Sequence, residues 1–98
     1  MAASVRLKEE EAVIEKLKGA NVFIRTVTHH FTGRLAAVEG GFAQLDDAAW
    51  IADDGRFADA LAEGKLAEVE PYPGTCYVSL GSIVDVSEWL HDLPREQV

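Results

Sequence analysis

The sequence predicts a mainly β domain with an N-terminal α-helix and a strongly bent, five-stranded antiparallel sheet that forms a small open barrel. Three features lead to this fold class. Short runs rich in β-branched and aromatic residues recur along the chain, a glycine lies inside the second run, and a Gly-Gly pair joins that run to the third. A helical insertion is expected between the third and fourth strands.

The N-terminal segment, residues 4–18, is predicted to be the helix. Ser4 is a suitable N-cap, and Gly19 follows as a terminator. Apolar residues recur between them at helical spacing, while Glu and Lys fill the other positions. This apolar stripe consists of Leu7, Val13, Ile14 and Leu17.

Residues 21–52 are predicted to form three consecutive antiparallel strands. The first run ends near residue 28, and His29-His30 is expected at a turn. The second strand ends at Glu39-Gly40-Gly41, a sequence that suits a tight hairpin turn into the third strand. Gly33 lies inside the second strand, where a missing side chain permits a sharp bend or a close backbone approach.

The rest of the chain is expected to hold the insertion, two more strands and a tail, all within one domain. In the insertion, residues 53–74, Asp53 or Asp54 is a suitable cap for a short helix that Gly64 closes. Residues 75–89 read as two strands broken at Gly81-Ser82. Residues 90–98 are predicted to be a frayed tail.

The amino-acid composition restricts the class of protein and the ligands that it can bind. The chain has 98 residues, of which 48% are hydrophobic and 27% charged, values typical of one soluble globular domain. The formal charge of −8 disfavours non-specific attraction to phosphate backbones. The single cysteine, Cys76, fits a reducing compartment, and no run is long enough to cross a membrane, so we expect a cytoplasmic protein.

Two local patterns are informative about the family. In the first, a strand glycine is followed by an apolar residue two positions later, an acidic residue at six and an apolar residue at nine, here Gly33, Leu35, Glu39 and Phe42. In the second, residues 80–86 form a short turn leading into an apolar last strand. These patterns resemble the two motifs of the Sm-like superfamily, and the likeness covers residues 5–89. Residues 47–51 and 70–72, in the region of the long insertion, make the chain look like a phage-associated or metagenomic branch of this superfamily.

The resemblance implies a cyclic homo-oligomer, a pentamer to heptamer, in which the fourth strand of one subunit pairs with the fifth strand of the next. The interface candidates are Tyr77, Val78, Leu80, Ile83, Val84 and Val86. It also implies RNA as a ligand, with Phe42, Ser82, Glu39 and Arg34 as candidate contacts. In such a ring, symmetry would repeat Arg34 or Arg56 as a circle of like charges.

Departures from the family weaken the RNA interpretation. Ala43 stands where these proteins usually have a base-binding asparagine, and Ser79-Leu80-Gly81 stands where they usually have a cationic pair. RNA recognition combines stacking, polar contacts to bases and positive charge, and the last two are depleted here. A ring that serves as a protein-interaction scaffold, with a protein rather than RNA as partner, is therefore the alternative.

No catalytic centre, cofactor or metal site is predicted. His29-His30 has no ligand partners at suitable spacing, and adjacent strand residues point to opposite faces. The pairs Asp46-Asp47 and Asp53-Asp54 are expected on a solvated face or at helix caps. Cys76 is expected to be a buried strand residue, and the tryptophans, Trp50 and Trp89, are expected to serve packing.

Overall fold

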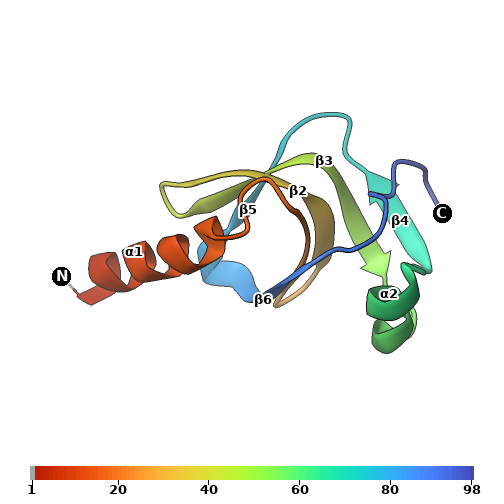
Figure 1. Cartoon of the computed structure of the whole chain (residues 1–98), viewed down its shortest axis with the longest axis horizontal. Helices are drawn as coiled ribbons and strands as arrows, with labels where there is room; N and C mark the ends of the chain where they lie inside the picture. The colour runs from red at the N-terminus through yellow and green to blue at the C-terminus, as the bar shows by residue number, and fades with distance from the viewer. Residues whose placement is uncertain (1) are drawn as a thin grey trace.

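The chain folds into a small bent sheet with a helix at each end (Figure 1). The computed structural model describes residues 2–98, and side chains from residue 8 onward. None of the described helices has the length and apolar composition needed to cross a membrane. In chain order the elements are α1 (Ala2–Glu15), β1 (Asn21–Thr26), β2 (His30–Glu39), β3 (Phe42–Asp53), α2 (Phe57–Glu63), β4 (Glu68–Pro71), β5 (Cys76–Ser79), the 3-10 helix η1 (Leu80–Ser82) and β6 (Ile83–Glu88).

The sheet is antiparallel and has six strands in the order β4-β3-β2-β1-β6, with β5 also paired to β3. The start of β3 pairs with β5, and its end pairs with β4. The predicted fold class is therefore confirmed, including the helix in the insertion. The count of five strands was one short, because residues 68–71 of the insertion form a strand on β3.

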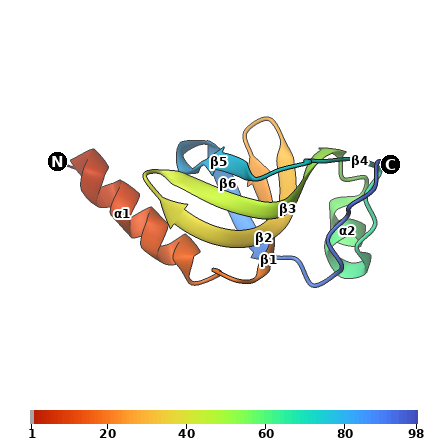
Figure 2. The same ribbon diagram turned by 90° about the horizontal axis from the view of Figure 1, so that it is seen from above.

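Strands β2 and β3 curve together (Figure 2), and Gly33 lies within β2. A Cβ atom on Gly33 would lie 2.9 Å from Leu45 Cβ and 3.3 Å from Ala48 Cα. The register between β2 and β3 also shifts between Thr32 and Arg34. The predicted close approach at this glycine is confirmed, and the sheet as a whole is strongly bent, as predicted.

The hairpin turn between β2 and β3 also follows the prediction. Gly40 and Gly41 both have positive φ, at 60° and 85°, which is the backbone of a type I′ turn. The N–H of Gly41 donates to Glu11 Oε2 at 2.9 Å, which fastens α1 to the turn.

Helix α1 differs from its predicted bounds. It already includes Ser4, which therefore lies inside the helix rather than at its cap, and its regular part ends at Glu15. Residues 16–19 continue as turns up to Gly19, whose φ is +90°, so glycine does end this segment. Ile14 and Leu17 pack against the barrel core, while the N-terminal turns project away from it (Figure 1).

Two hydrophobic cores lie on opposite faces of β1. The core inside the barrel consists of Val22, Ile24, Leu35, Ala43, Leu45, Ala48, Cys76, Val78 and Leu80. The second core lies under the insertion and consists of Phe23, Ala49, Ile51, Val69 and Trp89, with Phe57, Leu61, Leu66 and Leu93 packed against it. Burial on both faces explains the uninterrupted apolar run of residues 22–24 in β1.

The insertion and the tail are both ordered by contacts that the sequence prediction missed. Arg56, not Asp53 or Asp54, is the N-cap of α2, whereas Gly64 closes the helix as predicted, with its N–H bonded to Ala60 O at 2.9 Å. The tail was predicted to fray, which is wrong. Val98 exchanges two backbone hydrogen bonds with Val69, at 3.1 and 3.2 Å.

Candidate functional site

The outer edges of β5 and β6 are free of any strand partner in the described chain. Strand β5 pairs only with β3, and β6 pairs only with β1. The 3-10 helix η1 joins these two strands, which pair with different partners and not with each other. An unpaired edge presents a row of backbone N–H and C=O groups that another strand can bind.

The six predicted interface residues divide into three groups. Tyr77 and Val84 are 62% exposed, which is unusual for large apolar side chains. The side chains of Val78 and Leu80 lie in the barrel core, so only their backbone is available to a neighbour. Ile83 and Val86 are half-buried and pack against the same core.

A groove lies on the outer face of β2, β3 and β5, next to the hairpin turn. It has a volume of about 410 Å³. Its lining residues are Ala37, Glu39, Gly40, Phe42, Gln44 and Tyr77. Two of the predicted RNA contacts, Glu39 and Phe42, thus lie together, and Tyr77 joins them from the neighbouring strand. We call these six residues the aromatic groove.

Arg34 does not reach this groove. It lies in a separate hollow of about 280 Å³, and its guanidinium contacts two carboxylates, Asp46 at 3.3 Å and Asp47 at 3.2 Å. The sequence prediction had Asp46 and Asp47 pointing to opposite faces. Both reach Arg34, because Asp47 has a left-handed backbone with φ of 50°. The positive charge of Arg34 is therefore already compensated within the subunit.

Ser82, the fourth predicted RNA contact, lies at the end of η1. Its hydroxyl donates to Ser79 O at 2.8 Å, which closes the short turn between β5 and β6. Leu80, at the start of η1, donates its N–H to Gly41 O at 2.9 Å. The turn carrying Ser82 therefore lies against the hairpin turn that carries Phe42 and Glu39.

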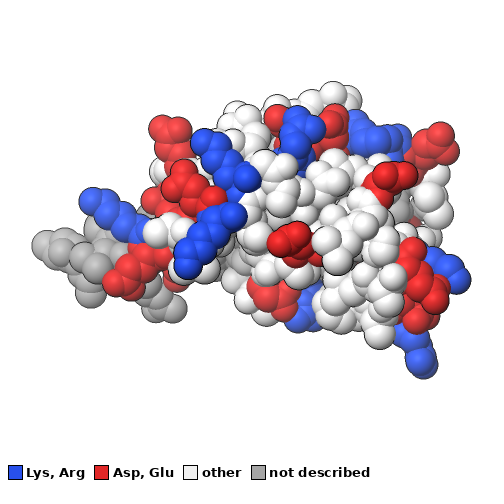
Figure 3. Space-filling model, viewed as in Figure 1, with Lys and Arg blue, Asp and Glu red and all other residues white. Residues whose placement is uncertain are grey.

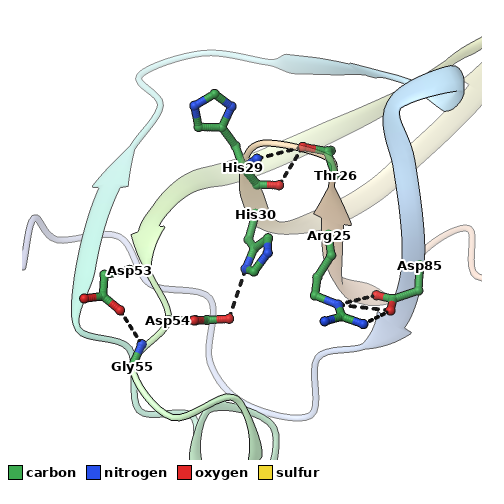
Figure 4. Close-up of polar contacts among 8 residues, drawn as sticks. All are labelled: Arg25, Thr26, His29, His30, Asp53, Asp54, Gly55 and Asp85. Atoms are coloured by element: carbon green, nitrogen blue, oxygen red, sulfur yellow. Dashed lines mark hydrogen bonds and ion pairs between the residues drawn. The ribbon is translucent and has the colours of Figure 1, made fainter.

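A second polar cluster joins β1, β2 and β6 to the loop before α2 (Figure 4). Arg25 Nε lies 3.0 Å from both carboxylate oxygens of Asp85, and the guanidinium carbon lies 4.5 Å from the ring centroid of Phe57. The hydrogen bonds from Arg25 lower the pKa of Asp85. His30 Nδ1 lies 3.0 Å from Asp54 Oδ2. These contacts tie the insertion to the barrel.

His29 lies at a turn as predicted, whereas the prediction is wrong for His30, which begins β2 and pairs with Arg25 and Ile51. Thr26 Oγ1 donates to His29 O at 2.6 Å, so His29 lies in the tight connection between β1 and β2. Its ring points away from that of His30, which turns toward Asp54 (Figure 4). Asp53 Oδ1 accepts the N–H of Gly55 at 2.7 Å and so stabilises the loop instead of capping α2.

The remaining candidates are packing residues. Cys76 is buried, and burial raises its pKa, which disfavours the reactive thiolate. Trp89 is buried in the second core and stacks on Phe23, with ring centroids 5.6 Å apart. Trp50 is half-buried beside His29, with ring centroids 5.2 Å apart.

Comparisons with known proteins concern the fold. No family model matches the sequence, and no curated protein matches it. Among solved structures, the chain is similar to the crystal structure of the P. aerophilum SmAP1 heptamer, with a TM-score of 0.54 and 20% sequence identity. The likeness covers 79% of this chain and 88% of that chain. This chain therefore has an Sm-like fold.

Proposed function

We propose that identical copies of this chain assemble head to tail into a ring, in which β5 of one subunit pairs with β6 of the next. The two unpaired edges of β5 and β6 carry this proposal, and Val84 on β6 is an exposed apolar residue. The edges belong to different strands, so each subunit offers two unlike surfaces. Such a contact repeats from subunit to subunit and closes into a cycle when the rotation permits.

The third edge of the sheet is protected against the same pairing. Val98 bonds to the outer side of β4 at Val69, and β4 is only 4 residues long. Short and covered edges are how natural sheets avoid unwanted strand addition. Strand addition is thereby directed to β5 and β6. A solved relative in fold, the SmAP1 protein, is a heptamer, which supports a ring in the predicted range of pentamer to heptamer.

A charge on the free edge of β6 tests the ring. Val84→Lys places a charge beside the cross-strand side chains of the neighbouring subunit, whereas the substitution of an exposed residue should destabilise the isolated subunit little. Val98→Lys is the matched control, because Val98 is also exposed, at 66%, but lies against β4. Light scattering should show a smaller particle for Val84→Lys only. Equal assembly of both variants would exclude β6 from the interface.

The charge distribution favours a protein scaffold as the role of the ring. The chain carries a formal charge of −8. The guanidinium groups of Arg25 and Arg34 are paired with carboxylates, and Arg95 donates to the carbonyl oxygens of Ala48 and Tyr72. On the face shown in Figure 3, acidic and basic side chains are interspersed around a largely uncharged centre. Such a surface attracts phosphate backbones weakly.

RNA binding is the second candidate, and one observation favours it. Phe42 is 47% exposed beside the turn that carries Ser82, so it offers a stacking surface to a base. Binding through phosphate contacts weakens steeply as salt rises. Oligonucleotides of several lengths and compositions should be titrated at low and at physiological salt. Failure of every RNA to bind at low salt would exclude this role.

A further inference from the structure

We propose that the aromatic groove binds a cationic side chain, an arginine or lysine, from a basic segment of a partner protein. The inference builds on the scaffold role, because it names the chemistry of the partner. The groove itself lies within one subunit, so binding does not require the ring. In a ring the groove would recur once per subunit, which would favour partners with repeated basic residues.

Strand register brings the two aromatic side chains to one face. In the β3–β5 pair, Gln44 lies opposite Tyr77 and Phe42 lies opposite Ser79. The intervening residues Ala43 and Val78 point into the core. Side chains alternate along a strand, so Phe42, Gln44 and Tyr77 share the outer face. Two exposed rings on one face of a groove form a surface that a cation can approach.

The groove has negative character without a compensating cation. Glu39 is exposed at its rim and has no ion-pair partner among the side chains that the structure describes. None of the lining residues is basic. The carboxylate of Glu11 accepts the N–H of Gly41, which lies in the chain between the lining residues Gly40 and Phe42. A guanidinium or ammonium group gains from both an aromatic face and a carboxylate.

The hollow around Arg34 shows what a compensated acidic site looks like in the same molecule. There, Asp46 and Asp47 are already paired with Arg34, and Thr75 Oγ1 also donates to Asp46 at 3.4 Å. An incoming cation would have to displace Arg34. The aromatic groove requires no such displacement, and for this reason we place the cation there.

A nucleic acid fits this groove less well. A base can stack on Phe42 or Tyr77, but its phosphates would meet Glu39 and a chain of net charge −8. The two ligands therefore respond oppositely to one substitution. Removing the charge with Glu39→Gln should weaken the binding of a cationic peptide and strengthen the binding of an oligonucleotide.

The test uses a fluorescein-labelled peptide of alternating alanine and arginine, and its analogue with neutral citrulline at every arginine. Binding to the full chain is followed by fluorescence anisotropy. We expect the arginine peptide to bind and the citrulline peptide to bind at least about fivefold more weakly. Glu39→Gln and Phe42→Thr should each lower the affinity for the arginine peptide by about fivefold. The control Glu68→Gln removes an exposed carboxylate on β4 and should change affinity by less than about twofold.

Two outcomes would overturn the proposal. Equal losses for Glu39→Gln and Glu68→Gln would mean that only net charge attracts the peptide. Oligonucleotide binding that Glu39→Gln strengthens and Phe42→Thr weakens, with no arginine-specific peptide binding, would make the groove an RNA site. Native mass spectrometry of the same samples distinguishes the test of the groove from the test of the ring. A peptide bound to unassembled chains would support binding in the groove and contradict assembly into a ring.

Discussion

The backbone N–H of Leu80 donates to the carbonyl oxygen of Gly41 at 2.9 Å and joins η1 to the hairpin turn of β2 and β3. Gly41 in turn donates its N–H to Glu11 of α1. Three segments far apart in the sequence are thus held together at one end of the barrel. The aromatic groove and both free strand edges begin at this end. The proposed ligand binding and the proposed ring assembly therefore both depend on this junction of α1, the hairpin turn and η1.

We predict that Glu11→Ala loosens this junction. The Gly41 N–H would lose a charged acceptor, which should lower the free energy of unfolding by about 1 kcal/mol. Hydrogen exchange should speed up at the Gly41 amide. Glu9→Ala, an exposed position on the same helix, is the control and should leave that exchange rate unchanged. Equal exchange rates in the two variants would show that the bond contributes nothing to the turn.

Gly33→Ala should be strongly destabilising. The new methyl group would lie 2.9 Å from Leu45 Cβ and 3.3 Å from the backbone of Ala48, so β2 and β3 would have to separate. Overpacking of this kind costs about 1–3 kcal/mol. Gly74→Ala meets no atom within 4 Å and should be neutral or slightly stabilising. Chemical denaturation compares the two, and equal stabilities would contradict the close packing at Gly33.

Thr32→Val should raise stability by about 1 kcal/mol. Thr32 is fully buried, and its hydroxyl oxygen has no hydrogen-bond partner, so an isosteric methyl group removes an unpaired polar atom. Thr26→Val is the contrasting variant, because Thr26 Oγ1 bonds to both the carbonyl oxygen and the N–H of His29. Denaturant midpoints should therefore move in opposite directions. A loss of stability in Thr32→Val would show that the hydroxyl is satisfied in solution.

The ion pair of Asp85 and Arg25 should make stability depend on acid pH. Hydrogen bonds from Arg25 lower the pKa of Asp85, so the unfolded chain binds this proton more readily than the folded one. The stabilisation is complete above the unfolded pKa and is lost as the pH falls through the lower folded value, below about pH 4. Asp85→Asn should be less stable than the wild type near neutral pH, and the difference should shrink in acid. A constant difference would rule out this linkage. Asp85 is partly exposed, so the effect should be small.

Much of the barrel could be predicted from local signals. The Gly40-Gly41 pair indicates a turn with positive φ, and Gly33 indicates a close approach of two strands. The apolar run of residues 22–24 indicates a strand buried on both faces. Strand β4 gave no such signal, because it is 4 residues long and ends in Pro71. The order of the tail rests on contacts with distant elements, such as Val98 with Val69, which no local pattern reveals.

The site was only partly predictable for the same reason. The spacing from Gly33 to Phe42 placed Glu39 and Phe42 correctly on one hairpin, where they line the aromatic groove. Tyr77 was expected at an interface, but its place beside Gln44 depends on the β3–β5 register. The capture of Arg34 by two carboxylates depends on a positive φ at Asp47, a residue type that gives little warning of it.

Leu80 is an interface candidate in the sequence, but Leu80→Asp would not be a clean test of the ring. Its side chain is 4% exposed and belongs to the barrel core, so the buried charge would unfold the subunit itself. Val84→Lys separates assembly from folding and should replace it.

Native mass spectrometry of the full chain, purified without nuclease, tests the central claim most directly. The proposed pairing of β5 with β6 predicts one closed species with the mass of a whole number of chains, in the range of pentamer to heptamer. A bare ring agrees with the scaffold role, and a ring with added nucleotide mass would support RNA binding instead. A monomer or dimer across the concentrations tested would contradict the ring.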